Sequence, residues 1–340
     1  MTSYWNYGEV FFIVFLFFKI ISTPQKIVFN LKKAIIALVF VVIVLIQSYF
    51  TGFDVIKVSL IIFYAYAAYI FPRYTLKLYL YIYFSVLLLN VFFQDFSKAN
   101  QFDFVFISAL FFVLKGKFEF NKQVVIFFIV VFLLEFLQSY LFSSRSHLLY
   151  AFLALIYFIF PFIRNMYVKA FPYFPFAYIL IMTFYYIYAI ELGLPITISN
   201  VERSSMIYWC VSNLQEFLIF GPGADAFIEG SKNSMFSGFH RITPNDPHSV
   251  FLFCFVTLGS VLTLILVAFY LHFLSKFKVL SFSPILMSIY LYLVLLLSVA
   301  TFTSDTRIAL GLSIGVLYYF SKSVKKCVVP DEYINSNCKL

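Results

Sequence analysis

The stretch NDPHSVFLFCFVTLGSVLTLILVAF, residues 245–269, decides how this chain folds. Its first four residues are polar, and the remainder carries no charged side chain. A helix needs roughly 17–25 predominantly apolar residues to cross a bilayer. The stretch therefore predicts a membrane-spanning helix with one histidine at its mouth.

The four polar residues have the pattern of a helix start. We expect Asp246 at the N-cap and Pro247 in the first turn, where its missing N–H costs nothing. His248 then lies in the first turn, where the helix dipole disfavours an imidazolium and keeps the ring able to accept a proton. The same amides can hold an anion such as phosphate. A lone interfacial histidine is often only a polar residue at the water boundary, so a catalytic role needs support from other residues.

The rest of the chain has the same apolar character. The 340 residues are 63% hydrophobic and 11% charged, with a mean hydropathy of +0.96, whereas a soluble domain carries about 25% charged residues. We expect an all-α, polytopic integral membrane protein with about eleven transmembrane helices. The expected spans are residues 8–22, 34–50, 55–71, 75–93, 102–114, 124–142, 147–163, 173–190, 248–274, 282–302 and 306–320.

Lysine and arginine gather in alternate loops, which sets the expected orientation. The cationic loops contain Lys26, Lys32 and Lys33; Arg73 and Lys77; Lys115, Lys117 and Lys122; Arg164 and Lys169; Lys276 and Lys278; and Lys322, Lys325 and Lys326. This pattern places the N-terminus outside (periplasmic) and the C-terminus in the cytoplasm. The net charge of +9 follows from it and does not indicate a nucleic acid partner. We expect N-terminal transmembrane helices over 1–122, a core over 123–321 and a cytoplasmic tail over 322–340.

The long segment 191–247 lies outside in this topology, between the eighth and ninth expected spans. Residues 202–220 (ERSSMIYWCVSNLQEFLIF) have helical periodicity, and Gly221-Pro222-Gly223 predicts a sharp stop. One face is apolar, and the other carries Arg203, Ser204, Ser212, Gln215 and Glu216. This pattern is typical of a helix lying on the membrane surface.

Outward-facing cations are rare in this chain, and several of them can flank the same outer cavity as His248. Arg145, Arg203, Arg241 and Arg307 are the candidates. The alternative for each is an arginine that snorkels to lipid headgroups or lies on a solvated helix face. Glu135 is of interest because a carboxylate inside a span is costly.

Three segments, in order, resemble the shared core of bacterial O-antigen polymerases (Wzy-type) and O-antigen ligases. They are SSRSHLLYAFLAL around Arg145, the RSSMIYW…FLIFGPGADAF segment that begins at Arg203, and NDPHSVFLFCFVTLGSVLTLI around His248. Ser249 stands where the family usually has Asn, and Leu258-Gly259 matches its later glycine. The resemblance covers about residues 140–265, and the first five expected spans carry no motif of the family.

The resemblance implies a GT-C-type glycosyltransferase that uses an undecaprenyl-pyrophosphate-linked oligosaccharide at the outer face of the bacterial cytoplasmic (inner) membrane. Arg145 and Arg203 then match the arginines that hold the pyrophosphate, and His248 matches the catalytic histidine. Guanidinium offers bidentate hydrogen bonds to phosphate without deprotonation. Further candidates for substrate binding are Arg241 and Arg307, and for supporting roles Glu202, Asn245 and Asp246. No D-x-D-like cluster occurs on the outer side, so we expect neither metal nor cofactor.

Polymerase and ligase share this core. The short chain and the divergent N-terminal half favour the polymerase, whose donor and acceptor are both lipid-linked, with a chain-length regulator as a further candidate partner. A ligase, which transfers the finished glycan to lipid A-core, is the alternative. A flippase for the same lipid-linked sugars and a non-catalytic partner of a polysaccharide complex are further alternatives.

Overall fold

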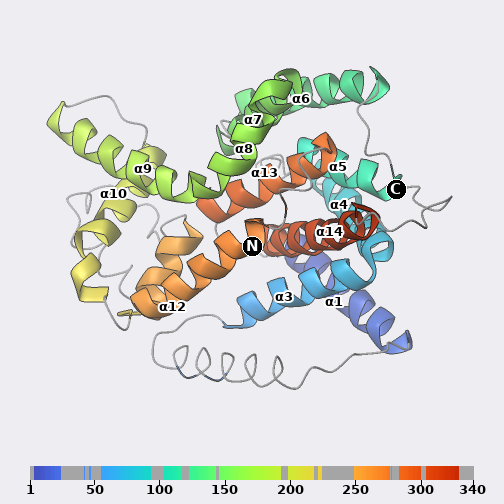
Figure 1. Ribbon diagram of the computed structural model, residues 1–340, viewed down its shortest axis with the longest axis horizontal. Helices are drawn as coiled ribbons and strands as arrows, with labels where there is room; N and C mark the ends of the chain where they lie inside the picture. The colour runs from blue at the N-terminus through green and yellow to red at the C-terminus, as the bar shows by residue number, and fades with distance from the viewer. Residues whose placement is uncertain are drawn as a thin grey trace.

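The computed structural model describes residues 4–23, 42, 46, 55–92, 103–116, 122–142, 145–192, 198–217, 221–223, 249–275, 277, 283–299 and 304–328. All regular structure in these residues is helical, which confirms the expected all-α class for the part of the chain described (Figure 1). Of the expected span 34–50, only Val42 and Ile46 are among the described residues.

Most of the described helices follow the apolar runs of the sequence, but the expected cationic loop with Arg164 and Lys169 is helical. The N-terminal part consists of α1 (Tyr4–Ser22), α3 (Val55–Ile70), α4 (Pro72–Phe92), α5 (Phe104–Leu114) and α6 (Lys122–Phe142). It continues through α7 (Arg145–Ile159), η2 (Pro161–Ile163), α8 (Arg164–Ala170), η3 (Phe171–Tyr173) and α9 (Phe174–Glu191). The remaining elements are α10 (Ile198–Ser212), η4 (Leu214–Phe217), α12 (Val250–Ser275), α13 (Pro284–Val299) and α14 (Ser304–Val328).

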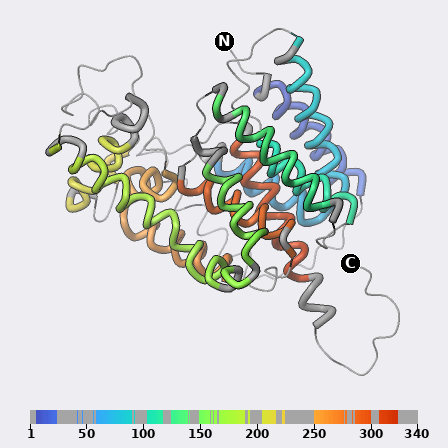
Figure 2. Tube along the Cα trace, turned by 90° about the horizontal axis from the view of Figure 1, so that it is seen from above, coloured from blue at the N-terminus to red at the C-terminus, as the bar shows by residue number. Residues whose placement is uncertain are grey.

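Helix α13 lies at the centre of the fold. Ile285, Ile289 and Leu293 are at most 1% exposed, and the helix contacts α5, α7, α9, α12 and α14. A helix that is apolar on all sides is stable only when it is surrounded. Figures 1 and 2 show α10 at one end of the molecule and α1 and α4 at the other, with α13 between them.

Helices α3 and α14 form the most extensive helix–helix contact among the described residues. A Cβ added at Gly311 would lie 2.8 Å from the carbonyl oxygen of Ile61, and one at Gly315 would overlap the carbonyl oxygen of Ala65. Small residues let helix backbones approach in this way, which increases dispersion contacts where no hydrophobic effect drives helix association. These glycines therefore fix α14 against α3.

Two described helices are long and apolar enough to cross a membrane, by length and composition alone. They are Met166–Tyr188, which runs through α8, η3 and α9, and Val250–Ser275. Shorter apolar helices are Val58–Ile70, Phe104–Leu114, Val124–Gln138 and Ile285–Ser298. The expected set of eleven spans is therefore not confirmed. Helix α14 continues to Val328, so the first part of the expected tail 322–340 is helical.

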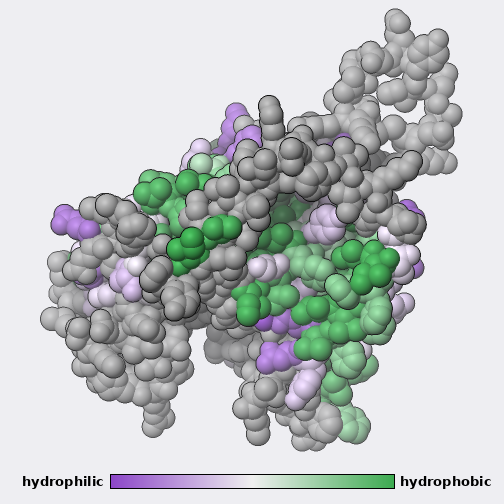
Figure 3. All heavy atoms as spheres, turned by 90° about the horizontal axis from the view of Figure 1, so that it is seen from below, coloured by the Kyte–Doolittle hydropathy of each residue, from purple (hydrophilic) through white to green (hydrophobic). Residues whose placement is uncertain are grey.

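Large apolar side chains remain exposed on many of the described helices. Examples on five helices are Phe18 (65% exposed), Ile62 (64%), Leu133 (58%), Ile181 (61%) and Leu264 (65%). One face of the molecule shows several apolar areas among its described residues, with hydrophilic side chains between and beside them (Figure 3). Soluble monomers rarely expose contiguous apolar patches of more than a few hundred Å².

Candidate functional site

Helix α10 is packed into the protein. Met206, Ile207 and Cys210 form a buried cluster with Leu252 and Val256 of α12, and α10 also contacts α9. The sequence pattern predicted Ser204 on a polar face at the membrane surface, but Ser204 is only 1% exposed. That prediction is wrong for Ser204, because α10 lies against its neighbouring helices where a surface position was expected.

Helix α12 is broken at Gly259, whose φ of 79° and ψ of 176° are not helical. Only glycine adopts this backbone region readily. The break divides α12 into residues 250–258 and 260–275, and a bend is visible in the helix (Figure 1). It also frees carbonyl groups that a continuous helix would use, and at membrane depth such groups must find partners within the protein.

The Gly221-Pro222-Gly223 turn fills the break. The amide of Gly223 donates to the carbonyl oxygen of Val256 at 3.2 Å, which in an unbroken helix would accept from Ser260. Gly223 has a φ of 96°, and a Cβ at Gly221 would overlap the Val256 carbonyl oxygen. Both glycines are therefore required by the geometry. We call α10, residues 221–223 and residues 249–258 the α10–α12 unit.

The start of α12 is described from Ser249 onward. The helix begins at Val250, and the amide of Phe253 donates to the carbonyl oxygen of Ser249 at 2.9 Å. Ser249 thus occupies the N-cap position of the described helix. Asp246, Pro247 and His248 lie outside the described residues; in the sequence they precede the positive end of the helix.

Most predicted site residues lie outside the described part of the structure. These are Arg241, Asn245, Asp246 and His248. Arg145 is described as the first residue of α7, and Glu202 and Arg203 as positions in α10, all by their backbone only. Position 203 lies one turn before Met206 and Ile207, on the face of α10 that packs against α12. The roles of these seven residues stay predictions.

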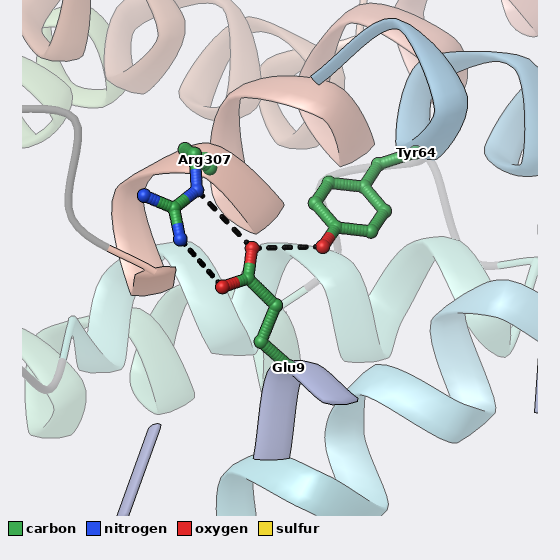
Figure 4. A network of polar contacts seen from close by, with 3 residues as sticks. All are labelled: Glu9, Tyr64 and Arg307. Carbon is green, nitrogen blue, oxygen red and sulfur yellow. Dashed lines mark hydrogen bonds and ion pairs between the residues drawn. The ribbon is translucent and has the colours of Figure 1, made fainter. Parts of the chain in front are cut away.

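Arg307 is the predicted site residue whose side chain is described. Its Nε and Nη2 atoms donate to the two carboxylate oxygens of Glu9 at 3.2 and 2.5 Å, and the Tyr64 hydroxyl donates to the same carboxylate at 2.8 Å (Figure 4). The arginine and glutamate side chains are 11% and 8% exposed. The network joins α14, α1 and α3. Its role in substrate binding stays a prediction, and sequence reasoning missed Glu9, whose signal was a carboxylate within the first expected span.

Glu135 has a structural function. It is fully buried on α6, and its Oε2 accepts from the amide of Phe104 at 2.9 Å. Phe104 is the first residue of α5, so Glu135 caps α5 from a neighbouring helix. First-turn amides have no partner within their own helix, and the Glu135 carboxyl oxygen supplies one for the amide of Phe104.

Within the described residues, no group of three or more His, Cys, Asp or Glu side chains could hold a metal ion. The groups in this part of the chain that can bind a ligand are instead helix-terminal amides, hydroxyls and arginine side chains. Comparisons with protein families, with curated proteins and with solved structures found no match for this chain.

Proposed function

We propose that this protein is a multi-pass glycosyltransferase of the bacterial cytoplasmic membrane that polymerises a surface polysaccharide. Its substrates are undecaprenyl-pyrophosphate-linked repeat units, joined at the outer face. The proposal starts from the resemblance of the three segments around Arg145, Arg203 and His248 to O-antigen polymerases and ligases. The proposal also includes the eleven membrane spans, the periplasmic N-terminus and the roles of the site residues.

The α10–α12 unit is the observation that carries the proposal. Arg203 and His248 lie far apart in the sequence and belong to different resembling segments. The buried cluster of Met206, Ile207 and Leu252 holds the helix of Arg203 against the helix that His248 precedes. The Gly223–Val256 hydrogen bond adds a second attachment between the same segments. A transferase needs its reactive groups fixed in this way, because displacements of about 1 Å are costly.

The chemistry follows from the residue types. A hydroxyl of the acceptor sugar attacks the anomeric carbon of the donor, and His248 takes the hydroxyl proton. The bond between that carbon and the phosphate oxygen breaks, and undecaprenyl pyrophosphate leaves. Arg145 and Arg203 hold the pyrophosphate and balance its growing negative charge, with Arg241 and Arg307 as further candidates. Asn245, Asp246 and Glu202 support these groups.

A multi-pass arrangement is supported by the exposed apolar surface. Leu133 of α6 and Leu264 of α12 are 58% and 65% exposed, and such surfaces are stable against lipid tails but not against water. The two helices of spanning length, Met166–Tyr188 and Val250–Ser275, belong to this surface.

The transporter alternative has weaker support. A transport pathway would be expected to show charged groups available inside the membrane. Glu135 caps α5, and Glu9 is paired with Arg307. Of the three buried carboxyl side chains in the described residues, Glu9 and Glu135 therefore have structural partners, and Asp103 is the N-cap residue of α5. This favours an enzyme with its site on the outer segment.

The test is surface glycan in cells that express single variants. His248→Ala, Arg145→Ala and Arg203→Ala should each abolish polymerised glycan while the protein stays in the membrane. His272→Ala and Arg73→Ala are matched controls, since both side chains are exposed and far from the outer segment in the expected topology, and they should retain long chains. Normal long chains in all three site variants would exclude the proposed site.

A lipopolysaccharide gel of the deletion strain separates the two transferases. A single repeat on the core indicates a lost polymerase. Absence of repeats on the core, with lipid-linked polymer accumulating, indicates a lost ligase and replaces the polymerase proposal by the ligase.

A further inference from the structure

Ser249 is a buried hydroxyl that lacks a hydrogen-bond partner. The residue is 0% exposed, and its Oγ makes no hydrogen bond in the part of the chain described. A serine at an N-cap ordinarily accepts from an amide two or three residues further on. Here that contact is absent, and a buried polar atom without a partner is unfavourable unless something else satisfies it.

The amides beside Ser249 are also without partners in their own helix. The first hydrogen bond of α12 runs from the Phe253 amide to the Ser249 carbonyl. The amides of residues 250–252 precede this bond, so α12 cannot satisfy them. Amides at a helix start point along the axis and favour negative charge, which makes them a common site for phosphate.

Ser249 lies immediately before the part of α12 that packs against α10. Leu252 and Val256, in this first part of α12, pack against Met206, Ile207 and Cys210. Position 203 lies on the matching face of α10. The start of α12, with the Ser249 hydroxyl and the first-turn amides, therefore lies beside the helix of a predicted phosphate-binding arginine.

We infer that the N-terminus of α12 binds the pyrophosphate of the lipid-linked donor, with the Ser249 hydroxyl donating to a phosphate oxygen. This inference rests on the proposed function and adds a binding residue to its site. The position next to His248 in the sequence places the bound phosphate close to the expected base. The leaving group then departs toward the positive end of a helix, where its charge is stabilised.

The chain offers a matched control in the same helix. Thr263 is 5% exposed, and its Oγ1 also makes no hydrogen bond in the described residues. It lies in the second part of α12, four residues beyond the break at Gly259 and separate from the start of α12 at Val250. Thr263→Val removes a buried hydroxyl of the same kind without touching the proposed site.

The experiment uses the purified full-length protein in detergent, with inorganic pyrophosphate as the probe at constant ionic strength. The measured quantities are the thermal unfolding midpoint without ligand and the apparent Kd from its shift on titration. Ser249→Ala should unfold at the same or a higher temperature without ligand and bind pyrophosphate at least tenfold more weakly. Ser249→Thr keeps the hydroxyl and should bind within about threefold of the wild type, and so should Thr263→Val.

Three results would overturn the inference. The first is a wild-type protein that does not respond to millimolar pyrophosphate, and the second is a Ser249→Ala variant with the wild-type Kd. The third is that phosphatidylglycerol vesicles stabilise the wild-type protein as much as pyrophosphate does, and that Ser249→Ala removes this stabilisation. That result would make the site one for lipid headgroups. Failure of the proposed function appears separately, as long glycan chains in His248→Ala cells, whatever Ser249→Ala does to binding.

Discussion

The helical body formed by α1, α3, α13 and α14 and the α10–α12 unit use the same kinds of residue in opposite ways. In the body, glycines close the gap between two intact helices, and the described carboxylate Glu9 is paired with Arg307. In the α10–α12 unit, a glycine breaks a helix, other glycines admit a turn into the break, and the Ser249 hydroxyl is unsatisfied. The first arrangement maximises stability. The second leaves the buried Ser249 hydroxyl without a partner among the described residues, as expected where a ligand binds.

The largest effect should come from breaking the ion pair in the body. Arg307→Met leaves Glu9 buried without its counter-charge, and we expect a loss of about 3–5 kcal/mol in the free energy of unfolding. Denaturant unfolding in detergent measures it. The double variant Glu9→Gln, Arg307→Met should regain most of the stability, because no buried charge remains.

The double variant also decides the role of Arg307. Loss of polymer at near wild-type stability would support a role in substrate binding, whereas normal polymer would remove Arg307 from the site. A stable Arg307→Met single variant would contradict the structural role of the pair.

Two glycine substitutions should separate the two regions. Gly311→Ala forces α14 away from α3 and should lower the free energy of unfolding by about 1–3 kcal/mol. Gly221→Ala displaces the turn from Val256 and should lower polymer formation on the order of 100-fold, with a smaller effect on unfolding. Thermal unfolding and glycan gels of both variants check this. If each variant altered both quantities equally, the contrast between the regions would fail.

The break in α12 should tolerate only glycine. Gly259→Ala places a Cβ in a backbone region that other residues avoid, at a cost of about 1–3 kcal/mol, and favours a straight helix that competes with the Gly223–Val256 hydrogen bond. Stability and polymer should therefore both fall. The control is Gly116→Ala, at another positive φ with nothing within 4 Å of the added Cβ, which should retain polymer. Full polymer in Gly259→Ala would show that the break has no functional importance.

The smallest effect should come from side-chain hydrogen bonds to the helix backbone. The Thr257 hydroxyl donates to the carbonyl of Phe253 at 2.7 Å, and the Ser313 hydroxyl donates to that of Ala309 at 2.8 Å. Thr257→Val and Ser313→Ala should each cost about 0.5–1.5 kcal/mol. Only Thr257→Val, next to the turn, should also shorten the glycan chains on a gel. Equal chain lengths in both variants would show that the contribution of the α12 break to polymer formation depends on Gly221 and Gly259 and not on the Thr257 hydroxyl.

Apolar runs were enough to predict most of the described helices, and the stop at Gly221-Pro222-Gly223 was visible from its turn chemistry. Helix α8 was not predicted, because its Arg164 and Lys169 gave it the composition of a cationic loop. The break at Gly259 was not visible, because a single glycine in an apolar run is tolerated in a straight helix and its φ depends on what packs beside it. Ser204 was misplaced for a similar reason, since periodicity identifies an apolar face but not the number of neighbouring helices. The pairing of Glu9 with Arg307 joins residues 298 apart, and local patterns carry no information at that distance.

The same pairing has a consequence for biosynthesis. In the proposed multi-pass arrangement α1 is synthesised before α14, so the carboxyl group of Glu9 reaches the membrane long before its arginine exists. Until then it must stay protonated, remain near the water boundary or be shielded by the insertion machinery. The arrival of α14 supplies the counter-charge, so a chain truncated before residue 307 would keep a buried acid without its partner.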